Sequence, residues 1–357
     1  MKKLDQYVIK EMFVPFLIGT FAVVFMFQAN TLIYLFKTFS LASIPPLAIA
    51  KLIALKTPFY LNMTLPVGVA LASSLGMSRL TRESELTAMR AAGVSILRVM
   101  APISAFGVLI GIGNYYLAES VMPPAEKSAT KLQTQLTILG GAPEFKADVL
   151  IHLGTFWAHF GSVSRGPNGS LDIADAFLIE SPGPYEQTVY TSKQGTYAQG
   201  VWSFPNSIYR VFKDDQLTEF LPRKGLTINQ QVDLNDLYTP QQATELSVGQ
   251  LREAIKTKKQ QGQDTTSLEV SLQTRFSVPA ACYVFALVGP VFAIWLGRSG
   301  GFVGVLLSIL MVLLYYNIYV ISTEVFGRNG WLSPVLSAWL PNILFLALAF
   351  IGLRRLE

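Results

Sequence analysis

Apolar residues dominate both ends of the chain, and one long polar stretch, residues 119–275, separates the two ends. Each end holds three runs without Asp, Glu, Lys or Arg, and each run has roughly the 20 residues that a helix needs to cross the hydrocarbon of a bilayer. These runs cover residues 12–36, 57–78, 99–118, 276–297, 299–323 and 329–353. The pattern predicts three membrane-spanning helices on each side of an extramembrane domain.

The composition favours a membrane protein over a soluble one. Hydrophobic residues make up 51% of the chain and charged residues 14%, whereas about a quarter of a soluble domain is charged. Core helices of a large soluble protein are usually shorter and seldom occur so often in one chain. The first run is too long for a cleavable signal peptide, and no small-residue cleavage site follows it. The single cysteine, Cys282, excludes an intramolecular disulfide and a cysteine-based zinc cluster.

The distribution of positive charge predicts the orientation of the spans. Outside the central stretch, ten Lys and Arg residues lie on one side of the membrane and four on the other. By the positive-inside rule, both termini and the loop between the second and third spans face the cytoplasm. The stretch 119–275 then lies outside. Because this stretch is slightly acidic, the positive net charge belongs to the membrane part and gives no indication of nucleic-acid binding.

The outer stretch predicts a β domain. Short alternating or aromatic-rich segments recur in it, among them 149–153, 173–179 and 208–212, and turn sequences rich in Gly and Pro separate them. Several short strands at near-regular spacing favour a sandwich or a jelly roll. We expect four aromatic side chains to point inward: Trp157, Phe177, Tyr197 and Trp202. The alternative is that this outer domain only increases solubility and has no other role.

From residue 247 to about 261 the pattern changes to that of a helix leading into the fourth span, with Leu251 and Ile255 on its apolar side. Its lysines could meet anionic headgroups of the outer leaflet, and a plain solvated linker helix fits the same pattern. The predicted domains are therefore 1–122, 123–265 and 266–357. The predicted fold class is an α-helical membrane protein with six transmembrane helices, three and three, and an inserted all-β, jelly-roll-like domain.

The predicted cytoplasmic loop at residues 79–93 has the pattern of a short helix. Its charges match the helix dipole, with acidic residues in the first turn and a basic residue in the last: Glu83, Glu85 and Arg90. Gly93 suits the left-handed position after a helix, and Leu86 and Met89 share one face. A helix this short is marginal alone. It either packs under the membrane helices or inserts into a groove on a cytoplasmic ATPase as a coupling helix.

Three segments of the chain resemble the lipopolysaccharide-export permease family, LptF/LptG (YjgP/YjgQ). They are Leu-Asp-Gln-Tyr-Val at 4–8, the loop at 79–93, and Gly-Arg-Ser-Gly-Gly at 297–301. The most specific part is Ser-Glu-Leu-Thr-Ala-Met-Arg-Ala-Ala-Gly at 84–93. The resemblance covers essentially the whole chain in order: three spans, an external β jelly roll and three more spans.

The resemblance implies a non-catalytic subunit of an ABC exporter in the bacterial inner membrane, with the β domain in the periplasm. The implied partners are an LptB-like cytoplasmic ATPase dimer, a second permease, LptC- and LptA-like bridge proteins, and lipopolysaccharide or a related acidic glycolipid. The chain has no Gly-x-x-x-x-Gly-Lys-Ser/Thr loop, so we expect it to bind no cofactor and its partner ATPase to use ATP and Mg²⁺. The residues assigned to the ATPase contact are Arg82, Glu83, Glu85, Leu86, Met89, Arg90 and Gly93.

Cations near the outer ends of the spans are candidate contacts for the phosphates of such a lipid: Lys37, Lys51, Lys56 and Arg328. Interfacial snorkelling is the more common role of lysines there. Apolar residues of the spans, such as Phe25, Val69 and Leu310, could contact acyl chains or ordinary lipid. Two acids near the outer ends, Glu119 and Glu324, either pair with these cations or lie in headgroup water, and we expect the second.

Two features of the spans predict how they pack. Prolines inside the second and fourth spans would kink or loosen those helices, as a cavity that opens and closes requires, although static membrane helices also tolerate them. These prolines are Pro58, Pro66, Pro279 and Pro290. Gly107 and Gly111 have the spacing of a close helix contact.

No group of residues suited to catalysis or metal binding is visible. His152 and His159 lack the spacing of metal ligands on a helix, and no Gly-x-Ser-x-Gly elbow or Rossmann fingerprint occurs. Two other functions stay open. One is an ABC permease that moves its outer domain without transporting lipid, and the other, with the least support, is a membrane-anchored enzyme acting on envelope lipids.

Overall fold

The computed structural model describes most of the 357 residues. The described ranges are 3–38, 45–139, 149–153, 155–165, 170–183, 186–213, 216–229, 242–260, 262–295 and 301–355. The chain divides into two compact units. The helical unit comprises Met1–Lys37, Leu47–Ala129 and Ala243–Glu357, and the β unit comprises Thr38–Pro46 and Thr130–Gln242.

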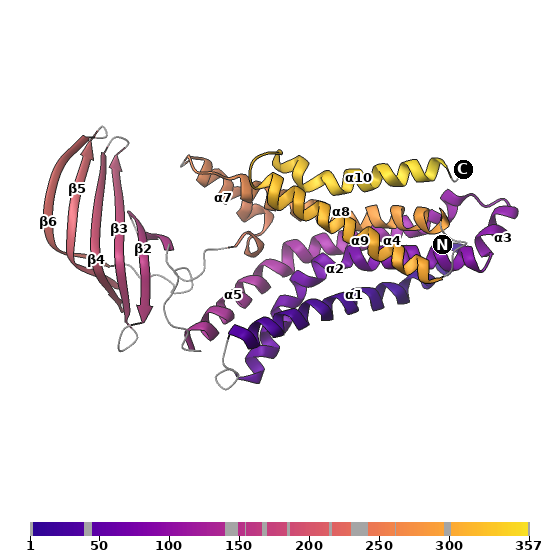
Figure 1. Cartoon of the computed structure of the whole chain (residues 1–357), viewed down its shortest axis with the longest axis horizontal. Helices are drawn as coiled ribbons and strands as arrows, with labels where there is room; N and C mark the ends of the chain where they lie inside the picture. The colour runs from indigo at the N-terminus through magenta and orange to yellow at the C-terminus, as the bar shows by residue number, and fades with distance from the viewer. Residues whose placement is uncertain are drawn as a thin grey trace. The chain divides into compact units, whose positions relative to one another are not determined.

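Within the described ranges, 6 helices are long and apolar enough to cross a membrane. They are built on α1 (Lys3–Thr38), α2 (Pro46–Arg82), α4 (Ile96–Tyr116), α8 (Thr266–Trp295), α9 (Gly301–Val320) and α10 (Pro334–Arg354) (Figure 1). Three of them precede the β strands in the chain and three follow. The predicted fold class, a helical membrane protein with an inserted β domain, is confirmed.

Several helices continue beyond the apolar runs that predicted them. The third span passes through a π-helical segment, η2 (Leu117–Val121), into α5 (Met122–Leu139). The polar residues of α5 therefore form a helix, whereas the sequence interpretation placed them at the start of the β domain. α9 likewise continues into a π-helical segment, η5 (Ile321–Gly327). Hydropathy detects the part of a helix inside the hydrocarbon but not its polar continuation, which explains the difference.

α8 lies at the centre of the helical unit. It packs against α4, α9, α10 and the short helix α7 (Val248–Gln260). Two glycines of α4 allow close approach to it. A Cβ atom added to Gly107 would lie 2.4 Å from the Cβ of Ala286, and one added to Gly111 would lie 3.0 Å from the carbonyl oxygen of Pro279. The predicted close contact at these two glycines is confirmed.

Helix α2 runs through Pro66 without interruption. Proline has no N–H, so the carbonyl of Asn62 one turn earlier lacks its usual helical donor. The side-chain amide of Asn114 in α4 donates to this carbonyl at 3.0 Å, and the hydroxyl of Tyr316 in α9 donates to the neighbouring carbonyl of Met63. Asn114 of the third span thus replaces the hydrogen bond that the proline removes, and Tyr316 adds a second contact to the same turn of α2.

The β unit contains one antiparallel sheet whose strands follow chain order (Figure 1). Its strands are β1 (Val149–Leu153), β2 (Phe156–Arg165), β3 (Leu171–Gly183), β4 (Glu186–Ala198), β5 (Val201–Lys213) and β6 (Gln216–Asn229). Each strand pairs with the next one, so the described sheet is a meander. The Greek-key crossings of a full jelly roll are not among its described connections.

Buried and exposed residues do not alternate regularly along the whole of each strand. At one point the buried positions shift by one residue, which we call the parity change. In β3 the buried hydrophobic residues are Leu171, Ile173, Ala176 and Leu178. Asp175, with a φ of 51°, lies at the change. Because of this shift Phe177, predicted to point inward, is 39% exposed, and that prediction was wrong. Tyr197 and Trp202 are buried as predicted, and Trp157 is half-buried.

Candidate functional site

A short helix, α3 (Glu85–Ala91), forms within the predicted coupling loop. It is shorter than residues 79–93, because Arg79 and Arg82 belong to the last turn of α2. Ser84, with a φ of 61°, lies between the two helices in the left-handed region and lets the chain change direction over one residue. Glu83 therefore lies in the turn rather than in the first turn of α3, and Glu85 alone of the two acids has that position.

The C-terminal end of α3 is a Schellman motif. Gly93 has a φ of 85°, and its N–H donates to the carbonyl of Arg90 at 2.9 Å. The N–H of Val94 donates to the carbonyl of Met89 at 2.9 Å. The predicted left-handed glycine is confirmed, and Arg90 lies in the last helical turn as predicted.

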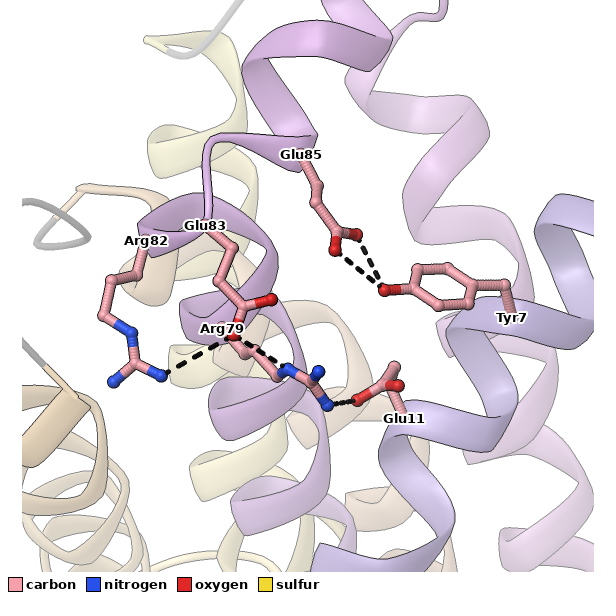
Figure 2. Close-up of polar contacts among 6 residues, drawn as sticks. All are labelled: Tyr7, Glu11, Arg79, Arg82, Glu83 and Glu85. Atoms are coloured by element: carbon pink, nitrogen blue, oxygen red, sulfur yellow. Dashed lines mark hydrogen bonds and ion pairs between the residues drawn. The ribbon is translucent and has the colours of Figure 1, made fainter.

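The first turns of α1 hold this region together. The hydroxyl of Tyr7 donates to the two carboxylate oxygens of Glu85 at 2.9 and 2.8 Å (Figure 2). Asp5 forms an ion pair with Arg98 of α4, with 2.6 Å between Oδ1 and Nη2. The segment 4–8 and the loop at 79–93, two of the three segments that carry the family resemblance, are thus in direct contact. The third segment lies almost entirely outside the described residues.

Figure 2 shows Arg79 between two carboxylates. Glu11 of α1 pairs with it on one side, and Glu83 accepts from its Nε at 3.1 Å on the other. Arg82 approaches the same Glu83 oxygen at 3.9 Å. These contacts are at least partly exposed, and such ion pairs contribute about 0–1 kcal/mol each. We name Asp5, Tyr7 and Glu11 the α1 latch, because they connect α1 to α4, α3 and α2.

Leu86 is the residue of α3 that the chain itself covers. Its side chain is 3% exposed and belongs to the same apolar cluster as Met12 and Ile96, with Met89 packed against that cluster. The sequence interpretation assigned Leu86 and Met89 to the ATPase contact, but in the structure they attach α3 to its own helical unit. The accessible residues of this region are polar or small: Arg82, Glu83, Ser84, Thr87, Ala88, Arg90, Ala91 and Gly93.

The predicted phosphate contacts lie in different surroundings. Lys56 forms an ion pair with Glu126 of α5 at 2.6 Å, and the carboxylate side chain is only 3% exposed. Lys56 is therefore already paired, whereas Lys51 is exposed on α2. The side chain of Lys37 lies outside the described residues.

The acids expected in headgroup water have protein partners. Glu324 pairs with Arg328 one helical turn later at 3.0 Å. Glu119 accepts the backbone N–H of Val248, at the start of α7, through both oxygens at 3.1 and 3.0 Å. The expectation was wrong for Glu119, because its binding group is a helix end that hydropathy does not detect. Glu324 is paired with a cation, which was the alternative, and at 46% exposure its side chain also remains accessible to water.

Arg275 is a buried cation that the sequence interpretation did not single out. Its side chain has an exposed fraction of 6%, and its guanidinium donates to backbone carbonyls on two sides. Nη1 donates to Ala118 in η2 at 2.7 Å, and Nη2 donates to three carbonyls before α7 at 3.0, 3.0 and 2.8 Å, those of Ala243, Thr244 and Leu246. One side chain thus joins the third span, the entry to α7 and α8. Its position directly before an apolar run was the only indication in the sequence.

α1 presents an apolar face that the described chain leaves uncovered. Its members follow helical spacing and are each more than half exposed: Val14, Ile18, Phe21 and Phe25. Leu310 of α9 is also about half exposed, whereas Val69, another predicted lipid contact, is fully buried. In the most apolar 18-residue segment of each helix, 33% is buried for α1 and 22% for the helix Ser308–Gly327, compared with 72% for α8. These two helices therefore offer the largest surface to lipid or a partner.

The membrane-length helices, the inserted sheet and the small helix held by α1 define a polytopic membrane subunit of the permease type. Among the residues described here, no three His, Cys, Asp or Glu side chains gather in a metal-binding arrangement. The chain belongs to the lipopolysaccharide export system permease LptF/LptG family, whose model matches residues 6–355. Members of this family are non-catalytic transporter subunits.

The chain is also similar to individual members of the family. It is 22% identical over 366 residues to the lipopolysaccharide export system permease protein LptF of Escherichia coli strain K12, and the match covers 97% of this chain and 93% of that protein. The LptF protein of Shigella flexneri matches with the same identity and coverage. The likeness thus includes both the helical unit and the β unit.

Proposed function

We propose that this chain is a permease subunit of an ABC exporter that extracts lipopolysaccharide, or a related acidic glycolipid, from the outer leaflet of the bacterial inner membrane. In this proposal both termini are cytoplasmic and the β unit is periplasmic, where it passes the lipid to LptC- and LptA-like bridge proteins. A second permease of the family completes the membrane cavity. An LptB-like ATPase dimer uses ATP and Mg²⁺ and drives the cycle. Family membership and the match to LptF proteins support this function.

The observation that carries the ATPase contact is the way in which α3 is held. Leu86 fixes one side of α3 to the helical unit, and the hydroxyl of Tyr7 ties Glu85 to α1. Glu83 in the preceding turn, and Thr87 and Arg90 of α3, are exposed to solvent. A force applied to these exposed residues therefore reaches α2 through a turn of two residues, Glu83 and Ser84, and reaches α1 through the latch. This is the arrangement that a coupling helix needs.

The uncovered faces of α1 and α9 support a role in holding the acyl chains or the second permease. Phe25 is 69% exposed and lies on the α1 face. Of the predicted phosphate contacts, Lys51 is exposed on α2, and Arg328 is also exposed although it pairs with Glu324. Lys56 would first have to leave Glu126, so we assign it a smaller role in holding the lipid.

The ATPase contact can be tested by co-purification. The double variant Glu83→Arg and Arg90→Glu should reduce the amount of ATPase that co-purifies with the tagged chain at least about tenfold, because reversed charges oppose a complementary surface. Arg354→Glu is the matched control, since this arginine lies at the end of α10 outside the α3 region. Unchanged ATPase recovery in the double variant would show that α3 is not the coupling element.

Orientation and cargo need separate measurements. Single cysteines introduced by Thr87→Cys and Lys193→Cys, both exposed positions, should react with an impermeant reagent from opposite sides of the membrane. Native mass spectrometry of the intact complex should detect bound glycolipid. Its consistent absence from an ATPase-competent complex would instead favour a permease that transmits force without transporting lipid.

A further inference from the structure

A groove with a volume of about 640 Å³ lies between α1 and α2 at the end that carries α3. Its lining residues are Lys10, Glu11, Val14, Pro15, Leu75, Gly76, Ser78, Arg79 and Arg82. The volume is within the range of about 300–1,000 Å³ that is typical of small-ligand sites. Some of these residues have roles above, Arg82 at the predicted ATPase contact and Glu11 in the latch, but the functions proposed above assign no ligand to the groove itself.

Charged and apolar residues are arranged in order along the groove. On α1, Lys10 precedes Val14 by one helical turn, and on α2, Arg79 and Arg82 follow Leu75 by one and two turns. One turn corresponds to about 5.4 Å along a helix. The cations therefore form the outer rim, and the apolar residues lie toward the middle of the membrane-length segment. Val14 is 59% exposed and so is available for contact with a hydrocarbon chain.

The cations of the rim differ in how strongly they are already paired. Arg79 lies between Glu11 and Glu83 (Figure 2), so its charge is largely balanced. Arg82 has a single long contact of 3.9 Å to Glu83. Lys10 is exposed and, among the residues that the structure describes, has no ion-pair partner. Lys10 and Arg82 are therefore the two cations with charge left for a ligand, one on each side of the groove.

We propose that this groove binds an anionic phospholipid of the cytoplasmic leaflet, with the phosphate between Lys10 and Arg82 and an acyl chain along Val14 and Leu75. A phosphodiester on a glycerol with attached hydrocarbon has the same order of groups as the groove. The bound lipid would bridge α1 and α2 beside the latch and so stabilise the arrangement that positions α3. The proposal deepens the proposed function, because its cytoplasmic location depends on the predicted orientation.

The test measures lipid binding by native mass spectrometry on the full-length chain in its co-purified complex. Phosphatidylglycerol and phosphatidylcholine are titrated separately, and glycerol 3-phosphate serves as a headgroup without acyl chains. We expect phosphatidylglycerol to bind in preference to the other two. Lys10→Gln should weaken its binding about fivefold, the contribution of one lysine beside an anionic lipid. Arg354→Gln, a cation of the same membrane side but outside the groove, should leave it unchanged.

Each contrary result has a specific meaning. Equal loss in Lys10→Gln and Arg354→Gln would show only general attraction of anionic lipid to a basic surface and would overturn the proposal. Binding of glycerol 3-phosphate as tight as that of the lipid would indicate a free-phosphate site instead. Binding that appears only after the ATPase is removed would assign the groove to that protein. Because lipid binding is measured without transport, a failure of the export function would not alter the result.

Discussion

The two ends of the helical unit hold their charges in opposite ways. At the end with α3, the carboxylates and arginines around Arg79 are mostly exposed, and each ion pair contributes about 0–1 kcal/mol. At the other end, Arg275 and Glu126 are buried with exposed fractions of 6% and 2%. Removing one partner of a buried pair destabilises a protein by about 3–5 kcal/mol.

The difference indicates which contacts can change during a transport cycle. Exposed ion pairs can exchange one partner for another with little change in free energy, so the α3 end can rearrange under a force such as the one we propose an ATPase applies. Buried charges can separate only if water or another group replaces the lost contact. The end around Arg275 is therefore a fixed joint, and the predictions below test this contrast.

The largest effect is expected for Arg275→Met. It removes the hydrogen bonds that the guanidinium donates to four backbone carbonyls, two of them in buried contacts. The lost stability should be about 4 kcal/mol or more, equivalent to a Tm lower by about 10 °C. Cys282 is fully buried and is the single cysteine of the chain, so a thiol-reactive dye reports unfolding. Arg275→Lys, which keeps the charge but has fewer donors, should give an intermediate Tm. A Tm within 2 °C of the parent for Arg275→Met would contradict a fixed joint.

The second effect concerns the pair between Lys56 and Glu126. Lys56→Met leaves the carboxylate buried without a cation, and we expect a loss of about 3 kcal/mol. Glu126→Gln leaves a lysine that is 21% exposed and can turn toward water, so the loss should be smaller, about 1–2 kcal/mol. The same dye assay measures both. Equal losses, or the reverse order, would show that the burial of Glu126 does not control the stability of this pair.

The sequence predicted the parts of the fold that depend on local composition. The apolar runs identified the spans, and Gly93 identified the end of α3, because a left-handed residue after a helix strongly favours glycine. The contacts of Arg275 were not predictable, since its acceptors come from segments far away in the chain. The parity change at Asp175 was also missed, because alternation assumes that every strand residue is extended.

The candidate site was predicted only in part, and Leu86 shows why. Its spacing from Met89 indicated an apolar face on α3, but spacing alone cannot say whether the chain or a partner covers that face. Tyr7 and Glu85 lie in segments that carry the family resemblance, yet nothing in the sequence indicated the hydrogen bond between them. Side-chain contacts between distant segments depend on packing, which only the structure supplies.

A smaller effect is expected at the α1 latch. Tyr7→Phe removes the hydrogen bond to Glu85, so the lost stability should be about 1 kcal/mol and the Tm should fall by about 2–4 °C. The effect should be local, with amide hydrogen exchange of residues 85–94 up to about fivefold faster, because α3 loses its connection to α1. Faster exchange throughout α1 and α2 would show instead that Tyr7 supports the whole helical unit. Tyr283→Phe, on α8, is a control for the loss of a partly exposed hydroxyl.

The smallest effect on stability is expected for Glu83→Gln. The carboxylate is 39% exposed, its partner Arg79 is 48% exposed and keeps Glu11 as a second partner, so the Tm should change by less than about 1 °C. ATPase recovery should nevertheless fall severalfold, because the lost charge lies on the surface that we assign to the partner. This separation between an unchanged Tm and weaker binding is the opposite of the result for Arg275→Met, which should lower the Tm strongly.

If Glu83→Gln lowered the Tm as much as Lys56→Met, the α3 end would be as rigid as the opposite end. The exchange of exposed ion pairs could then not be the means by which α3 moves.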